Sequence, residues 1–171
     1  LMNAYYSGDR QRFSENDRVC IPVPFYHCFG CVMGTLASAV YGAAMVVPAE
    51  SFEPDATLVA VEHERCTVLY GVPTMFSAEV HSPEFAKYDL RSLRTGIMAG
   101  SPCPIELMKQ VTRDMHLTEM TIAYGQTEAS PVVTQSKTTD SLDARVSTVG
   151  SVLPGVEVRI VDPNSQCDVP E

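Results

Sequence analysis

The feature that most constrains the fold of this 171-residue chain is a repeated alternation between short apolar runs and longer helical segments. The short runs have the length of strands and lie at residues 19–24, 44–47, 67–70, 93–99, 120–123 and 156–161. Segments with the composition or spacing of helices lie between them, at residues 28–41, 55–65 and 74–80 and from Pro104 to Met115. Short apolar strands that alternate with helices form parallel sheets covered on both faces. We therefore predict an α/β fold with a mostly parallel open sheet and helices on both faces.

Polar stretches and prolines divide the chain further. We predict an irregular lead-in, an α/β subdomain, a polar loop and the truncated start of a following β segment, at residues 1–18, 19–134, 135–147 and 148–171 respectively. Pro22 and Pro24 would interrupt a sheet ladder, so the first strand is expected to be irregular or to lie at an edge. Because the sequence begins at Leu1 and ends abruptly at Glu171, we expect it to be a piece of a longer protein.

Composition and charge limit the classes of partner. Hydrophobic residues make up 45% of the chain, which is enough for a sizeable core. The net charge of -9 argues against nucleic acid or an anionic membrane as a partner. No apolar run reaches the roughly 18 residues that a membrane-spanning helix needs. The six cysteines are far from the density of a disulfide scaffold, so we expect reduced thiols and a cytoplasmic location, or the mitochondrial matrix in a eukaryote.

The residues that follow each predicted strand indicate where chemistry can occur. Right-handed crossovers bring the carboxyl ends of parallel strands to one edge of the sheet, where ligands bind. The runs at this edge are residues 24–27, 71–74, 99–102 and 124–128, and the last two are expected to be neighbours. Together they offer glycines, an aromatic ring, a hydroxyl and a carboxylate, which suit a planar base beside a phosphate and its metal ion. Each run alone also has a structural explanation, such as a helix-capping turn or a packed tyrosine.

A second class of function is indicated by the run Cys28-Phe29-Gly30-Cys31. A Cys-x-x-Cys pair at the start of a helix is typical of dithiol oxidoreductases, because the helix N-terminus lowers the pKa of a thiol. The other four cysteines are scattered singly, so no four-ligand metal site is predicted. A dithiol enzyme would expose a reactive Cys28, whereas the wall of another site would keep this thiol buried and slow to react.

The run Ala123-Tyr124-Gly125-Gln126-Thr127-Glu128-Ala129-Ser130-Pro131 resembles the Tyr-Gly-x-Thr-Glu signature of adenylate-forming enzymes, which include acyl- and aryl-CoA synthetases, luciferases and adenylation domains. Other segments match the family in the right order, at residues 24–30, 70–76, 99–102 and 149–162. The sequence is most similar to the AMP-dependent acyl-CoA synthetases of the medium-chain family member 2 type. The resemblance covers about residues 19–162 and implies a flavodoxin-like subdomain of the N-terminal domain of such an enzyme.

On the nucleotide side, the resemblance implies a role for each residue of two turns. Tyr124 would stack on adenine opposite the turn Gly100-Ser101-Pro102, and the backbone of Ala123 would lie near the adenine amino group. Gly125 and Gln126 would adjoin the nucleotide. Thr127 would hydrogen-bond the α-phosphate, and Glu128 would hold Mg²⁺.

On the acyl side, the resemblance places His27 beside the acyl carboxylate and the entrance for the thiol of coenzyme A. Phe29, Gly30 and Gly71 would line the substrate pocket, and His27, Thr127 and Glu128 would be catalytic. The family reaction joins a carboxylic acid to ATP, with release of pyrophosphate, and then transfers the acyl group to coenzyme A. This chain lacks the family's phosphate loop and C-terminal lid, so we expect it to be inactive alone and to bind adenylate weakly at best.

The acid itself is less constrained. Residues 22–34 contain no acidic side chain that could pair with the ammonium group of an amino acid. Small residues on the following helix are expected to leave room beside an apolar tunnel: Gly30, Gly34, Ala37 and Ser38. These observations favour a fatty acid, and an aryl-CoA ligase or another adenylate-forming enzyme is the alternative.

Overall fold

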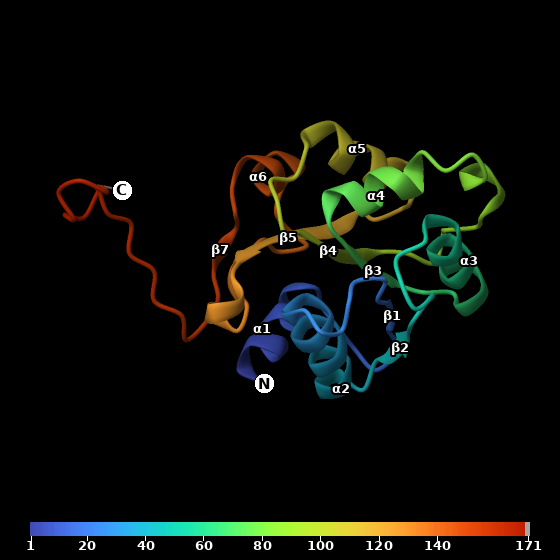
Figure 1. The fold of residues 1–171 in the computed structure, drawn as a ribbon, viewed down its shortest axis with the longest axis horizontal. Helices are drawn as coiled ribbons and strands as arrows, with labels where there is room; N and C mark the ends of the chain where they lie inside the picture. The colour runs from blue at the N-terminus through green and yellow to red at the C-terminus, as the bar shows by residue number, and fades with distance from the viewer. Residues whose placement is uncertain (170–171) are drawn as a thin grey trace.

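The computed structural model describes residues 1–169, which form one seven-stranded sheet in the order β2-β1-β3-β4-β5-β6-β7 (Figure 1). The strands are β1 (Arg18–Cys20), β2 (Ala44–Val46), β3 (Val68–Gly71), β4 (Thr95–Ala99), β5 (Glu119–Gly125), β6 (Val132–Gln135) and β7 (Ser151–Val152). The first five are parallel, and β6 and β7 are added antiparallel. The predicted mostly parallel open sheet is confirmed. The order of its parallel part, 2-1-3-4-5, is that of flavodoxin-like folds.

Helices cover both faces of the sheet, as predicted (Figure 1). One face carries α1 (Met2–Arg10), the π-helical η1 (Phe29–Leu36) and its continuation α2 (Ala37–Tyr41). The other carries α3 (Pro54–Glu64), α4 (Pro73–Val80), α5 (Ile105–Asp114) and α6 (Leu142–Ser147). Two single-turn 3-10 helices, η2 (Phe85–Lys87) and η3 (Thr127–Ala129), lie in connections. Within residues 1–169, no helix is long and apolar enough to cross a membrane.

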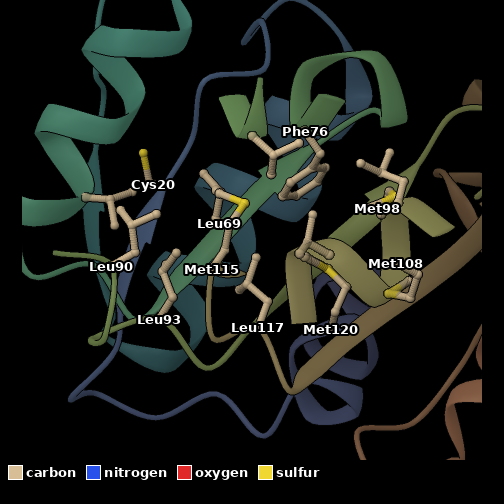
Figure 2. Close-up of a cluster of buried hydrophobic side chains, with 14 of the residues drawn as sticks. Cys20, Leu69, Phe76, Leu90, Leu93, Met98, Met108, Met115, Leu117 and Met120 are labelled. Carbon is tan, nitrogen blue, oxygen red and sulfur yellow. The ribbon is translucent and has the colours of Figure 1, made fainter. Parts of the chain in front are cut away.

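The alternation of side chains along the strands divides the core into two clusters. On β3, Val68 and Tyr70 pack toward α1 and η1, whereas Leu69 packs toward α3, α4 and α5. Figure 2 shows the second cluster, which brings together Leu69, Phe76, Met98, Met108, Met115 and Met120. Burial on both faces explains why the parallel strands read as continuous apolar runs.

Of the two alternatives predicted for the first strand, the edge position is wrong. β1 pairs with β2 on one side and with β3 on the other. The strand ends at Cys20, so Pro22 and Pro24 follow the ladder instead of interrupting it. Their missing N–H groups are therefore not needed for strand pairing.

The lead-in predicted to be irregular contains the helix α1. Gly8 lowers the intrinsic helix propensity of this segment, which is why the sequence pattern predicted irregular structure here. In the structure Gly8 allows a close approach, because a Cβ placed there would lie 2.4 Å from Cε2 of Tyr41. Packing of α1 on α2 thus outweighs local propensity.

The polar segment 135–147 is also more ordered than predicted, since it contains the end of β6 and the helix α6. Ser141 caps this helix by accepting a hydrogen bond from the N–H of Ala144 at 3.1 Å. The guanidinium of Arg145 donates to the carbonyls of Thr118 and Met120, both at 2.9 Å. A charged residue therefore anchors the segment from a buried position, which composition alone does not reveal.

The strand predicted at residues 156–161 is absent from the described part of the chain. After β7 the backbone leaves the sheet (Figure 1), and the single bridge in this region joins Val161 to Asp168. Val158 and Ile160 are exposed. An alternating pattern forms a strand only where a neighbouring strand completes the hydrogen bonds, and none lies beside this segment.

Glu79 on α4 is a carboxyl group buried within the fold. Its side chain is 1% exposed, and Oε2 has no hydrogen-bond partner in the described residues. Burial raises the pKa of Glu79 well above its usual range. The ionisable neighbour Cys20 is itself buried and offers no positive charge. The protonated form of Glu79 is therefore the one that the fold accommodates.

We expect Glu79→Gln to remove a pH dependence of stability and Glu79→Met to raise stability. A raised pKa in the folded state gives stability that is full below the unfolded pKa of about 4.3 and is lost as pH rises toward the folded pKa. Over that window, stability of the native protein should fall by up to about 1.4 kcal/mol per pH unit. Met also removes the unpaired polar atom, for a gain of about 1–3 kcal/mol at neutral pH.

Urea unfolding at pH 5 and pH 8 measures both effects. Glu50→Gln, at an exposed position, is the control. Its free energy of unfolding should change between pH 5 and pH 8 as much as that of the native protein. If the free energy of unfolding changes with pH as much in Glu79→Gln as in the native protein, Glu79 does not cause the pH dependence.

Candidate functional site

A cavity of about 350 Å³ opens at the carboxyl-terminal edge of the sheet, where the sequence predicted a site. Its walls come from the segment after β1, the start of η1, the ends of β4 and β5, and the β5–β6 connection that contains η3. The lining residues are His27, Cys28, Phe29, Met33, Ala99, Gly100, Ala123, Tyr124, Gly125, Gln126, Thr127, Glu128, Pro131 and Val132. The predicted neighbourhood of the β4 and β5 turns is thus confirmed, because these two strands are paired.

A second cavity, of about 830 Å³, adjoins the first at Tyr124. It is lined by Ser101 and Pro102 and by residues 146–150, and it shares Gly100 and residues 123–125 with the first. The side chain of Tyr124 is 55% exposed and contributes to both walls. An exposed aromatic ring that lines both cavities can stack on a planar group bound in either one.

Two glycines shape the turns at this edge. Gly100 has a φ of +92°, a conformation that favours glycine, and packs over Val72. At Gly125, an added Cβ would lie 2.0 Å from the carbonyl oxygen of Pro131. The pairing of β5 with β6 shifts register between Tyr124 and Gly125, and such an irregularity redirects side chains.

The β5–β6 connection is closed by a hydrogen bond from the N–H of Gln126 to the carbonyl of Pro131, at 2.9 Å. It holds Thr127 and Glu128 on the wall of the first cavity, and both residues are exposed. Because the backbone of Gln126 is tied to Pro131, the position of Thr127 depends on how closely Gly125 approaches that proline.

His27 and Cys28 contact the site from the opposite wall. The N–H of Phe29 donates to Nδ1 of His27 at 3.1 Å. Sγ of Cys28 lies 3.5 Å from Oγ1 of Thr127 and 3.7 Å from Nδ1 of His27. The segment after β1 is therefore in contact with η3, although Cys28 and Thr127 are 99 residues apart in the sequence.

Glu128 has the properties of a ligand for a hard cation. Within residues 1–169 its carboxylate forms no ion pair, and no cluster of three or more His, Cys, Asp or Glu side chains could hold a metal ion by itself. Mg²⁺ is commonly bound by one or two carboxylates together with substrate phosphates and water. An exposed, unpaired carboxylate on a cavity wall fits that mode of binding.

The structure does not place all the predicted pocket residues on a cavity wall. Gly30 is packed against backbone, since an added Cβ would lie 2.5 Å from the carbonyl oxygen of Pro24. Gly71 is buried against Phe76. Neither residue lines the first or the second cavity.

The expected apolar tunnel beside the helix is likewise not formed by its small residues. Gly34 lies against the side chain of Ile21, and Ala37 and Ser38 are fully buried. The small residues allow η1 and α2 to approach the sheet closely and leave no open space.

Cys28 is not buried as expected for the wall of a site. It is partly exposed, and its thiol lies among the groups that line the first cavity. Cys31 is exposed and lies outside this cavity, and both thiols are free. The two cysteines of the motif therefore have different surroundings.

Other cavity residues were not identified from the sequence. Met33 lies one turn after Phe29 on η1, and Val132 follows the β5–β6 connection. The spacing of four residues from Phe29 could have indicated Met33. No local signal indicates Val132, because β6 was not predicted.

Comparisons with known proteins agree on one family. The model of the AMP-binding enzymes matches residues 1–171. The proposed acyl-CoA synthetase YngI of Bacillus subtilis is 56% identical over 165 residues, which are 96% of this chain and 30% of YngI. The mitochondrial medium-chain acyl-CoA ligase ACSF2 of Danio rerio is 44% identical over 170 residues, which are 98% of this chain and 28% of ACSF2.

Among solved structures, ATP-bound MatB from Rhodopseudomonas palustris is similar, with a TM-score of 0.81 and 26% sequence identity. The match covers 98% of this chain and 32% of MatB. The chain thus spans less than a third of the length of the proteins it matches.

Proposed function

The chain belongs to the family of AMP-binding enzymes, and from this premise we propose that it forms the adenine-side and acyl-side walls of an ATP-dependent acyl-CoA synthetase. The observation that supports the proposal best is the β5–β6 connection. Together with the end of β5 it presents an exposed aromatic ring, a hydroxyl and an unpaired carboxylate, from Tyr124, Thr127 and Glu128, along two cavities that share lining residues. The proposed site is the one that the sequence indicated.

The proposed reaction has two steps. An oxygen of the substrate carboxylate attacks the α-phosphorus of ATP, and the bond to pyrophosphate breaks to give an acyl-adenylate. The sulfur of coenzyme A then attacks the acyl carbon, AMP leaves, and the thiol proton is released. Both steps place negative charge on phosphoryl oxygens, so hydrogen-bond donors fixed beside those oxygens lower the barrier.

The nucleotide side of the proposal uses both cavities. Adenine would lie in the larger one, between the turn at residues 100–102 and the ring of Tyr124, with the backbone of residues 123–126 along its edge. The hydroxyl of Thr127 would then donate to the α-phosphate in the smaller cavity. Glu128 would hold Mg²⁺, which when bound neutralises charge on the phosphate oxygens.

The acyl side of the proposal rests on the apolar part of the smaller cavity. Phe29, Met33 and Val132 are buried residues on its wall, which suits an apolar acid. His27 stands beside this wall and would face the reacting carboxylate and the incoming thiol. We propose a fatty acid as substrate, in keeping with the medium-chain relative from zebrafish, and an aryl acid is the alternative.

The experiment that tests the function is an assay of the full-length protein that contains this chain. Butyrate, octanoate, palmitate, benzoate and an amino acid are supplied in turn with ATP, Mg²⁺ and coenzyme A, and AMP and thioester are measured. We expect a thioester from an aliphatic acid. A thioester from benzoate alone would favour the aryl-CoA ligase, and no AMP release with any acid would contradict the proposal.

Tyr124→Ala should raise the KM for MgATP by about tenfold, because stacking of a base on an aromatic side chain contributes about 1–3 kcal/mol. Tyr124→Phe keeps the ring and should recover most of the loss. Steady-state kinetics at saturating acid and coenzyme A measure both variants. An unchanged KM in Tyr124→Ala would show that the ring does not contact the nucleotide.

The activity of the chain on its own and its location in the cell are also part of the proposal. We propose that residues 1–171 alone are inactive and bind adenylate weakly, because phosphate-binding and lid segments of the family lie in the remaining two thirds of its members. We also propose a cytoplasmic location, or the mitochondrial matrix in a eukaryote, since the name of the zebrafish relative describes that protein as mitochondrial.

A further inference from the structure

The thiol of Cys28 bridges two walls of the site and is not used by the proposed reaction. Its Sγ contacts Oγ1 of Thr127 at 3.5 Å and Nδ1 of His27 at 3.7 Å. Cys28 and Thr127 are carried by separate elements, the residue before η1 and the first residue of η3. No other side-chain hydrogen bond to the Thr127 hydroxyl is formed within residues 1–169.

The hydrogen-bond partners determine which way the protons point. Nδ1 of His27 already accepts the N–H of Phe29 at 3.1 Å, and a neutral imidazole has one in-plane lone pair on that nitrogen. The thiol proton therefore has Thr127 Oγ1 as its available acceptor. A hydroxyl that accepts at its oxygen keeps its own hydrogen free to donate elsewhere.

We propose that Cys28 is a positioning residue that donates to Oγ1 of Thr127 and so turns the Thr127 hydroxyl hydrogen into the cavity. The inference rests on the proposed function, in which that hydroxyl donates to the α-phosphate. Cys28 itself touches neither substrate nor nucleotide in this role. The same geometry leaves the neutral His27 with its proton on Nε2, so that this imidazole is a hydrogen-bond donor.

This role also explains why the two cysteines of the Cys-x-x-Cys motif differ. Cys28 is partly exposed and contacts Thr127, whereas Cys31 is exposed and has no side-chain hydrogen bond in the described residues. The pair has the spacing of a dithiol, but only its first member is directed at the site. Cys31, three residues further along and within η1, therefore provides a matched control.

The test is a double-mutant cycle in the full-length protein with Cys28→Ala, Thr127→Val and both changes together. Loss of one neutral hydrogen bond to the hydroxyl that stabilises the transition state predicts a fall of about three- to tenfold in kcat/KM for MgATP in Cys28→Ala. Cys28→Ser keeps a donor and should recover part of the loss. In the Thr127→Val background the Cys28 change should add nothing, because the residue acts through that hydroxyl.

The outcomes separate this inference from the proposed function. If the native protein forms thioester but the effects of Cys28→Ala and Thr127→Val multiply, Cys28 acts independently of Thr127 and the inference is wrong. It is also wrong if Cys31→Ala lowers kcat/KM as much as Cys28→Ala, or if Cys28→Ser recovers none of the loss. If the native protein forms no thioester with any acid, the proposed function fails and the inference falls with it.

Discussion

Glu128→Gln should lower kcat/KM for thioester formation by about 10²–10³-fold in the full-length protein. Glu128 supplies the only carboxylate among the described residues that line the smaller cavity. It is also free of ion pairs within residues 1–169, so no neighbouring cation competes for it. Gln keeps the size of the side chain and removes its charge, and a neutral amide is a poor ligand for Mg²⁺.

The measurement is the dependence of the rate on Mg²⁺ concentration at fixed ATP. Glu128→Gln should require more Mg²⁺ for half-maximal rate, and Glu128→Asp should lie between the two. Glu106→Gln on α5 removes an exposed carboxylate outside both cavities and is the control. A large loss of rate in Glu128→Gln with an unchanged Mg²⁺ dependence would assign Glu128 a role other than metal binding.

The parts of the site that the sequence predicted are those fixed by local chemistry and by the topology of parallel sheets. Residues 99–102 and 124–128 follow apolar strands, and parallel pairing of β4 with β5 places their carboxyl ends together. Topology indicated these runs, and the resemblance to the Tyr-Gly-x-Thr-Glu signature then singled out Tyr124, Thr127 and Glu128 within them. The order of the five parallel strands, 2-1-3-4-5, is one in which ligands bind at the carboxyl ends of the strands.

The parts that could not be predicted depend on contacts between distant segments. Gly8 and Gly30 look like turn or pocket residues in the sequence, but each allows a neighbouring group to approach closely, Tyr41 and the backbone of Pro24 respectively. The contact of Cys28 with Thr127 joins residues far apart in the chain. Local pattern carries no information about which small residue faces a cavity and which faces another backbone.

Gly125→Ala should disrupt the site by moving the backbone that carries it. The built Cβ lies 2.0 Å from the carbonyl oxygen of Pro131, 2.9 Å from its carbonyl carbon and 3.0 Å from Cα of Val132. These are backbone atoms and cannot rotate away, so β5 or the β5–β6 connection must shift by about 1 Å. Thr127 and Glu128 lie on that connection, and misplacement by about 1 Å can cost about 10²-fold in rate.

We therefore expect Gly125→Ala to lower kcat/KM by at least about 10²-fold and to lower the melting temperature, measured by steady-state kinetics and thermal unfolding. Gly155→Ala is the control for backbone strain alone. Gly155 has a φ of +79°, but no atom lies within 4 Å of its built Cβ, so Ala should cost about 1 kcal/mol of stability and leave the rate unchanged. Near-native activity of Gly125→Ala would mean that the β5–β6 connection yields to the added methyl group without moving Thr127 or Glu128. The proposed roles of those two residues would then no longer depend on the close approach of Gly125 to Pro131.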